Sequence, residues 1–148
     1  MQTLIISDTA CLILFDKIGK LNVLKDLFQT VTITSKIAEE FKKETPNWII
    51  IQDPKNTSNF NAFSEILDPG EASAIALSKE IKDCLLILDD LKARQLADEL
   101  NLKYTGSIGI LILAKRKGLI ADIDVVITKI QATNFRISNA IINKLKSA

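Results

Sequence analysis

The sequence has 148 residues, 47% of them hydrophobic, which predicts one ordinary globular domain with its own core. Nineteen basic and eighteen acidic residues leave a net charge of +1, so the whole-molecule charge favours neither a nucleic acid nor a membrane as partner. Histidine is absent, which excludes Ser-His-Asp triads, histidine general bases and histidine-ligated zinc. Carboxylates, hydroxyls, lysines and arginines remain for any chemistry.

The two cysteines, Cys11 and Cys84, lie inside apolar runs, so we expect buried thiols in a reducing compartment rather than a disulfide framework. The N-terminus has no basic targeting region, and the apolar runs are far shorter than the ~20 residues that a membrane helix needs. We therefore expect a soluble cytoplasmic protein.

Short apolar or β-branched segments alternate along the chain with segments of helical periodicity. The predicted strands cover residues 4–7, 31–34, 48–51, 84–88 and 103–105. The predicted helices cover residues 10–18, 21–28, 36–44, 60–67, 69–81, 93–100, 107–117, 123–130 and 139–146. Ser35 is expected to cap the helix that follows it, residues 55–59 to form a loop, and the strand at 48–51 to be buried.

This alternation predicts an α/β fold in which a parallel sheet of about five strands has helices on both faces and right-handed crossovers. If the first strand is central and the chain returns to place the fourth strand beside it, the strand order is 3-2-1-4-5. The topological switch point then lies between Asp8, after the first strand, and Asp89 and Asp90, after the fourth. Open α/β sheets place their chemistry at this edge.

The acids at this switch point are candidates for metal binding. Two carboxylates ~4 Å apart repel by about 4 kcal/mol at an effective dielectric constant of about 20, so such a cluster takes up protons or binds a divalent cation. Ligands that are all oxygen favour Mg²⁺ or Mn²⁺. The alternative for Asp8 and Asp90 is that each caps the helix that follows it.

Three glutamates elsewhere in the chain differ in what their positions imply. Glu39 is predicted to face solvent and to pair with Lys43, whereas Glu40 flanks the apolar face of its helix. Glu71 ends the sequence Asp68-Pro69-Gly70-Glu71, whose capping-box spacing explains its position without a functional role.

Seven segments, taken together in this order, carry a resemblance to a known family: residues 6–9, 37–41, 70–77, 88–94, 105–111, 114–120 and 135–138. They resemble the PIN domain, and in particular a poorly characterised branch of VapC-like proteins. The resemblance implies a three-layer α/β/α fold, a cluster of acids that binds Mg²⁺ or Mn²⁺, and hydrolysis of RNA phosphodiester bonds. Such proteins often act as the toxin of a toxin–antitoxin pair, which implies RNA, a cognate antitoxin and a second copy of the chain, in a homodimer, as partners.

By position, the resemblance makes Asp8, Glu40, Glu71 and Asp90 the catalytic acids. Glu71 stands where many members have an aspartate, and Asp89 adds a carboxylate that many members lack. The predicted metal ligands are Asp8, Asp89, Asp90 and Glu71. We expect Asp8, Glu71 and Asp90 to converge in one pocket, with Glu40 at its rim.

Four residues near these acids are predicted to bind substrate: Thr9, Lys92, Arg94 and Ser107. Lys92 and Arg94 are placed to hold a phosphate backbone, and Ser107 to orient a phosphate or a metal-bound water at a helix N-terminus. The alternative for Ser107 is a plain N-cap. The basic residues 115–117 are expected to complement the dipole of the helix that they end.

The predicted function is a metal-dependent ribonuclease, in which a metal-bound water attacks RNA and a carboxylate or the metal-bound hydroxide serves as base. The alternative is a catalytically inactive PIN-like module that binds RNA or a partner protein. A phosphoacceptor receiver is a third alternative, but receivers place paired acids after the first strand, where Asp8 stands alone. Walker A and GxGxxG patterns are absent, which leaves nucleotide binding without support.

The region after the first strand contains more apolar residues than one sheet face readily covers: Leu12, Leu14, Phe15, Leu21, Leu24, Leu27 and Phe28. Some of them are expected to be exposed in a monomer and to form an interface with an antitoxin or a second copy. The alternative is that Ile141, Ile142 and Leu145 of the last helix cover them.

Overall fold

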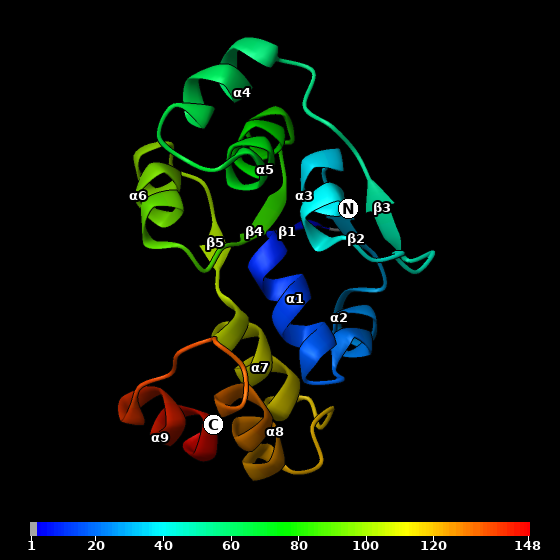
Figure 1. Cartoon of the computed structure of the whole chain (residues 1–148), viewed down its shortest axis with the longest axis vertical. Helices are drawn as coiled ribbons and strands as arrows, with labels where there is room; N and C mark the ends of the chain where they lie inside the picture. The colour runs from blue at the N-terminus through cyan, green and yellow to red at the C-terminus, as the bar shows by residue number, and fades with distance from the viewer. Residues whose placement is uncertain (1–2) are drawn as a thin grey trace.

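The computed structural model describes residues 3–148, which form a parallel five-stranded sheet flanked by helices (Figure 1). The strand order is β3-β2-β1-β4-β5, as predicted. The strands are β1 (Leu4–Ser7), β2 (Val31–Ile33), β3 (Ile49–Ile51), β4 (Cys84–Ile87) and β5 (Tyr104–Thr105). The helices are α1 (Thr9–Lys17), α2 (Leu21–Phe28), α3 (Ser35–Phe41), α4 (Thr57–Ser64), α5 (Pro69–Glu80), α6 (Leu91–Glu99), α7 (Ser107–Arg116), α8 (Ile123–Gln131) and α9 (Asn139–Ser147).

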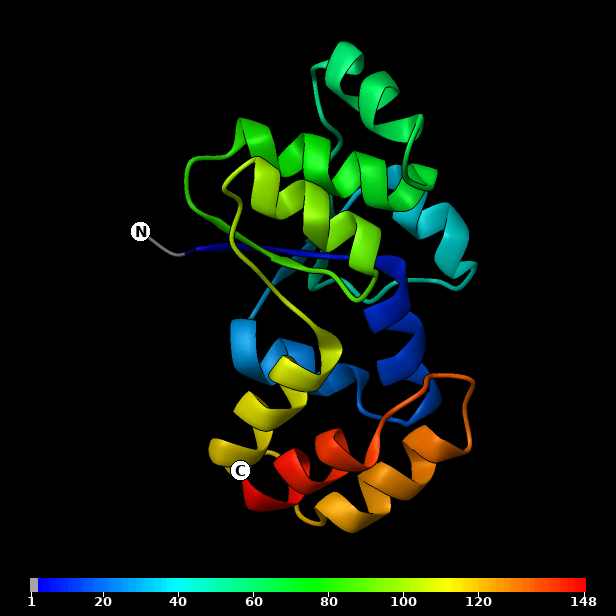
Figure 2. The same cartoon turned by 90° about the vertical axis from the view of Figure 1, so that its left-hand side faces the viewer.

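Seen edge-on, the sheet has helices on both faces (Figure 2). α3, α4, α5 and α6 lie on one face, and α1, α2 and α7 lie on the other. α9 packs against α7 and α8 on the side away from the sheet. The three-layer α/β/α prediction is therefore confirmed. Because β1 and β4 pair in parallel with Ser7 opposite Ile87, the residues that follow them meet at one edge.

α5 is buried on nearly all sides, and this burial fixes the position of its N-terminal turn near that edge of the sheet. Its residues 72–78 are all buried, and five of these seven are alanine or serine. Small side chains let α3, α4, α6 and the sheet approach α5 closely. The N-terminal turn of α5 is thereby brought against α3, where Gly70 faces Glu40.

Two helix boundaries and one strand differ from the prediction for local reasons. α3 ends at Phe41, three residues earlier than predicted, because Lys42 adopts the left-handed conformation with φ 61°. α4 begins at Thr57, inside the predicted loop, because the side chain of Asn56 accepts a hydrogen bond from a backbone N–H of its first turn. β3 is an edge strand whose last two isoleucines are exposed, so the predicted burial holds only for its start.

The prediction that Ser35 caps α3 is wrong. Thr34, not Ser35, occupies the N-cap position, and its Oγ1 accepts from the backbone N–H of Ile37 at 3.2 Å. Thr34 Oγ1 also lies 2.6 Å from Ser73 Oγ. Because the single hydroxyl hydrogen of Ser73 is donated to the carbonyl of Gly70, the Thr34 hydroxyl donates to Ser73. Both hydroxyls are buried, so this small network ties α3 to α5.

Thr34→Val is therefore expected to lower the free energy of unfolding by about 1–3 kcal/mol, because it removes the cap and the bond to Ser73 without changing side-chain volume. Ser35→Ala is the matched control. The Ser35 hydroxyl donates to Asp53 at an exposed position, so its loss is expected to cost less than about 1 kcal/mol. Urea unfolding of both variants measures the difference, and equal losses would contradict the assignment of the cap.

The apolar residues after β1 are covered within the chain itself. Four of the seven are buried, namely Leu12, Leu14, Phe15 and Leu24. The other three, Leu21, Leu27 and Phe28, are half-buried and pack against the core. The expectation that some are exposed is wrong, because α1 and α2 pack on each other and α2 packs on β2.

Two further expectations concern the burial of the cysteine thiols and the absence of a membrane-spanning helix. Cys11 is buried and Cys84 is half-buried, and both are free thiols. Across residues 3–148, no helix combines the length and the apolar character that crossing a membrane requires.

Candidate active site

Asp8 links the ends of the two central strands. Its Oδ1 accepts from the backbone N–H of Cys11 at 2.9 Å, and its Oδ2 accepts from the backbone N–H of Asp89 at 2.9 Å. The first bond makes Asp8 the N-cap of α1, and the second joins it to the residue after β4. The predicted cap is therefore confirmed, and Asp8 lies at the predicted switch point.

The carboxylate of Asp8 is buried, with 3% of the residue exposed, so its ionised form is unfavourable. Burial is the main cause that raises its pKa from 3.8 to about 7, and the negative charge of Asp89 raises it further. Hydrogen bonds from the N–H groups of Cys11 and Asp89, and the positive charge of Arg94, act in the opposite direction. The site therefore favours an added proton or cation.

Asp89 is held by the first residue of α7. The backbone N–H of Ser107 donates to Asp89 Oδ1 at 2.8 Å, and the Ser107 hydroxyl donates to Oδ2 at 2.5 Å. The N-cap position of α7 belongs to Gly106, so the plain N-cap interpretation of Ser107 is wrong. Ser107 lies at the predicted site, where its hydroxyl orients a carboxylate.

Glu71 and Asp90 form a second acidic pair next to the first. Asp90 caps α6 by accepting from the N–H of Ala93 at 3.1 Å, and Asp68 caps α5 by accepting from the N–H of Glu71 at 2.9 Å. Glu71 is half-buried, and its pKa rises from 4.5 to about 8 because of burial first and then the charges of Asp68 and Asp90. The capping predictions for Asp68 and Asp90 are thus confirmed.

Glu40 lies at the junction of α1, α3 and α5. Its Oε1 accepts from the hydroxyl of Thr9 at 2.6 Å, so Thr9 contacts an acid of the site. The same carboxylate lies against Gly70, where a Cβ atom would collide with it. Any larger residue at position 70 would push the end of the Glu40 side chain out of this position.

Glu39 faces solvent as predicted, but its partner is different. It lies 4.0 Å from Lys36, one turn earlier in α3. Lys43 lies beyond the end of α3 and pairs with Asp16, so the predicted pair between Glu39 and Lys43 is wrong.

In this arrangement the acids form two adjacent pairs rather than one cluster. Among residues 3–148, no three acids come close enough to hold a single ion as they stand. The physical reason is that Asp8 and Asp90 each cap a helix, which turns their oxygens toward backbone N–H groups. The chemistry of the donor set nevertheless fits a hard divalent cation, because every donor is a carboxylate oxygen and two of these groups have raised pKa values.

Of the two predicted cations, the structure brings only Arg94 to the acids. Arg94 Nε donates to the carbonyl of Leu88 at 2.8 Å, and the guanidinium lies 5.5 Å from the centre of the Tyr104 ring. The guanidinium also lies over Gly106, where a Cβ atom would collide with it. Lys92 is exposed and lines a separate hollow beside α6.

A cavity that the sequence interpretation missed opens beside Asp89. This α7–α9 cavity has a volume of about 640 Å³ and lies between the start of α7 and the segment that joins α8 to α9. Its lining includes Asp89, Arg94, Tyr104, Phe135, Arg136 and Lys144. One sequence signal was available, since residues 103–148 contain eight basic and two acidic side chains, although the whole chain is nearly neutral.

Lys115 and Arg116 lie in the last turn of α7, as predicted, but Lys115 also contacts a second helix. Lys115 Nζ donates to the carbonyls of Leu145 and Lys146 at 2.9 and 2.6 Å. These carbonyls belong to the last turn of α9, so Lys115 complements the dipole of α9 and fixes that helix against α7. This contact supports one wall of the α7–α9 cavity.

Comparison with known protein families agrees with this geometry. The sequence model of a family described as a PIN domain matches residues 4–148. No curated protein and no solved structure matches the chain. PIN domains are generally nucleases, which are hydrolases, and they generally use divalent metal ions. Because the match covers nearly all of the sequence, the chain belongs to the PIN-domain family.

Proposed function

We propose that this protein is a Mg²⁺- or Mn²⁺-dependent endoribonuclease of the VapC-like branch. The observation that carries the proposal is the pair Asp8 and Asp89, placed at the ends of the two central strands with more negative charge than the surroundings neutralise. Glu71 and Asp90 add two more carboxylates beside this pair. Such a set suits a divalent ion rather than a monovalent one.

Asp8, Asp89, Asp90 and Glu71 would hold the metal. When bound, the ion supplies a water nucleophile at neutral pH and stabilises the charge that develops on the phosphate. Arg94 is placed to bind a phosphate oxygen, because within residues 3–148 only its Nε donates a hydrogen bond and its charge already reaches Asp8.

Glu40 is the carboxylate that we assign to proton acceptance from the attacking water. Histidine is absent from the sequence, so a carboxylate is the remaining side chain for this role near neutral pH. Its Oε1 accepts from Thr9, and among the described residues no hydrogen bond engages Oε2. Thr9 therefore orients Glu40 and leaves one oxygen for a proton.

The alternative function is a catalytically inactive PIN-like module that binds RNA or a partner protein. The separation of the acids into two pairs, with no three of the described acids positioned around one ion, favours this alternative. The toxin role, a cognate antitoxin and a homodimer belong to the proposal and rest on the resemblance to VapC-like proteins.

The proposal predicts cleavage of single-stranded RNA that requires Mg²⁺ or Mn²⁺ and stops in EDTA. Glu40→Gln is expected to lower kcat by about 10²-fold or more, because the amide cannot accept the proton. Glu39→Gln is the matched control, since Glu39 is the neighbouring glutamate and faces solvent. The measurement is the initial rate of cleavage of a labelled oligoribonucleotide by each variant.

Two outcomes would contradict the ribonuclease proposal, and a third would contradict only the role of Glu40. The first is the absence of metal-dependent cleavage by the purified wild-type protein, which would favour the inactive module. The second is cleavage that persists in EDTA. The third is an equal rate for Glu40→Gln and Glu39→Gln, which would remove Glu40 from the mechanism.

A further inference from the structure

The α7–α9 cavity combines positive charge with an aromatic surface next to the acids. Arg136 and Lys144 are both exposed, and among the described residues neither forms an ion pair with an acid of the chain. Arg94 is different, because it is half-buried, donates from Nε to the carbonyl of Leu88 and lies close to the acids. The two outer cations are therefore available to an anion from solution.

Phe135 is fixed by the backbone that precedes it. Its N–H donates to the hydroxyl oxygen of Thr133 at 3.1 Å, and this hydroxyl donates to the carbonyl of Ile130 at 2.6 Å. The turn thus continues from the last turn of α8, and the Phe135 ring is half-buried at the cavity wall. The backbone of Phe135 is held in place, and its half-buried side chain supplies an aromatic surface on which a base can stack.

The charge of the chain is divided between its two parts. Residues 103–148 contain eight basic and two acidic side chains, whereas residues 1–102 contain eleven basic and sixteen acidic ones. Asp89 and Arg94 lie where these parts meet, and Arg136 and Lys144 lie on the basic side. A polyanion that places one phosphate at the acids would therefore extend its chain toward the basic side rather than across the acidic one.

We infer that the α7–α9 cavity binds one nucleotide of a single-stranded nucleic acid, with its phosphate on Arg136 and Lys144 and its base on Phe135. That the strand is RNA rests on the proposed function. The strand then follows a path from the acids past Arg94 into the cavity. A single strand is required, because a base can stack on Phe135 only when it has left its own helix.

The test measures binding without cleavage. Anisotropy of a fluorescein-labelled octaadenylate in EDTA gives the affinity of the full chain. Arg136→Ala combined with Lys144→Ala is expected to weaken binding by about tenfold or more, and to reduce the slope of log K against log salt by about 0.7 per lost phosphate contact. Circular dichroism checks that the variant is folded.

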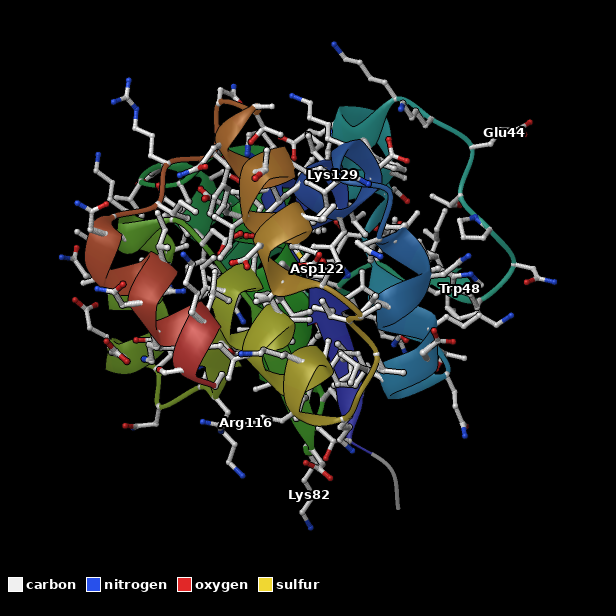
Figure 3. All side chains as sticks on the ribbon, turned by 90° about the horizontal axis from the view of Figure 1, so that it is seen from below. Glu44, Trp48, Lys82, Arg116, Asp122 and Lys129 are labelled. Carbon is white, nitrogen blue, oxygen red and sulfur yellow. The ribbon has the colours of Figure 1, made fainter. Side chains whose placement is uncertain are left out.

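The control removes the same charge at another place. Arg116 and Lys129 are exposed residues of α7 and α8 outside the cavity lining, and Figure 3 shows the Arg116 side chain in solvent beyond the end of α7. Arg116→Ala combined with Lys129→Ala is expected to change affinity by less than about twofold. Equal weakening by the two double variants would overturn the inference, because it would show diffuse attraction only.

A separate competition measurement tests the contact between the base and Phe135. Adenosine 5′-monophosphate is expected to displace the labelled strand at a lower concentration than inorganic phosphate, and Phe135→Leu is expected to reduce this preference by about fivefold or more. No preference in the wild-type protein would overturn the nucleotide assignment. Displacement by poly-L-glutamate that is as strong as displacement by octaadenylate would overturn it too, because the cavity would then accept any polyanion, including an acidic protein.

The two proposals fail separately. If cleavage requires the acids but the affinity for octaadenylate does not depend on Arg136 and Lys144, only the cavity inference is wrong. If affinity depends on these residues but no metal-dependent cleavage occurs, the ribonuclease proposal is wrong and the cavity remains a strand-binding site.

Discussion

Asp8→Asn is expected to abolish metal-dependent RNA cleavage, by about 10³-fold or more, while making the metal-free protein more stable at pH 8. The two effects have one cause, which is the buried negative charge of Asp8. Its pKa of about 7, against 3.8 for the ordinary side chain, corresponds to at most about 4 kcal/mol of unfavourable free energy for the charged form. Asparagine removes this charge but keeps only one of the two backbone hydrogen bonds, at a cost of about 1–3 kcal/mol.

The gain in stability should depend on pH in a defined direction. Because the pKa of Asp8 is raised in the folded state, the folded protein binds more protons than the unfolded chain between about pH 4 and 7. The stability of the wild-type protein therefore falls through this window as pH rises. Asp8→Asn lacks the contribution of Asp8 to this dependence and keeps that of Glu71, so its advantage over the wild-type protein should be absent near pH 4 and reach about 1–2 kcal/mol at pH 8.

Urea unfolding in EDTA at several pH values measures this difference. Asp122→Asn is the control, because Asp122 also caps a helix but lies exposed at the start of α8 (Figure 3), and asparagine caps as well as aspartate. The control is expected to change stability by less than about 0.5 kcal/mol. If Asp8→Asn is less stable than the wild-type protein at pH 8, the cap of α1 outweighs the charge, and Asp8 is chiefly a structural residue.

The affinity for Mn²⁺ is expected to rise by as much as about 10³-fold between pH 6 and 9. Asp8, with a pKa of about 7, and Glu71, with a pKa of about 8, are both largely protonated at pH 6. A metal ion must displace these protons, so binding weakens as pH falls below each pKa. The sign is that of ligand deprotonation, because the carboxylate form alone binds the ion.

Isothermal titration with Mn²⁺ in buffers of different ionisation enthalpy counts the protons released. We expect up to about two protons per ion at pH 6 and almost none at pH 9. Glu71→Gln should remove one of them and flatten the pH dependence to about tenfold, whereas Glu39→Gln should change neither quantity. An affinity that is constant from pH 6 to 9 would show that Asp8 and Glu71 are not ligands of the ion.

The layers and the sheet order were predictable from the sequence because they depend on local patterns. Four apolar or small residues mark β1 and five apolar residues mark β4, and an acid directly after each run marks the switch point. Parallel pairing then brings Asp8 beside Asp89, which is the contact that the structure shows. Helix geometry predicts that Glu39 faces solvent and that Glu40 flanks the apolar face, because one step along a helix turns a side chain by about 100°. The place of Glu40 beside the other acids was implied by the resemblance to the PIN domain.

Other features depend on contacts between distant segments, which local patterns do not encode. Thr34 rather than Ser35 caps α3 because Ser73, thirty-nine residues later, accepts its hydroxyl hydrogen. Arg136 and Lys144 reach the acids only through the packing of α9 on α7, so their positions in the sequence indicate charge but no site. The division of the acids into two pairs follows from helix capping, which competes with metal binding for the same oxygens.

The collision between Glu40 and any side chain at position 70 has an evolutionary consequence. A methyl group at position 70 would force the carboxylate end of Glu40 to move, whereas a shorter aspartate at position 40 would leave room for it. A larger residue at position 70 is therefore tolerated in the fold, but it displaces the Glu40 carboxylate from the place where Thr9 holds it. In related chains that keep the function of this carboxylate, we expect glycine at the start of α5 to co-occur with glutamate in α3.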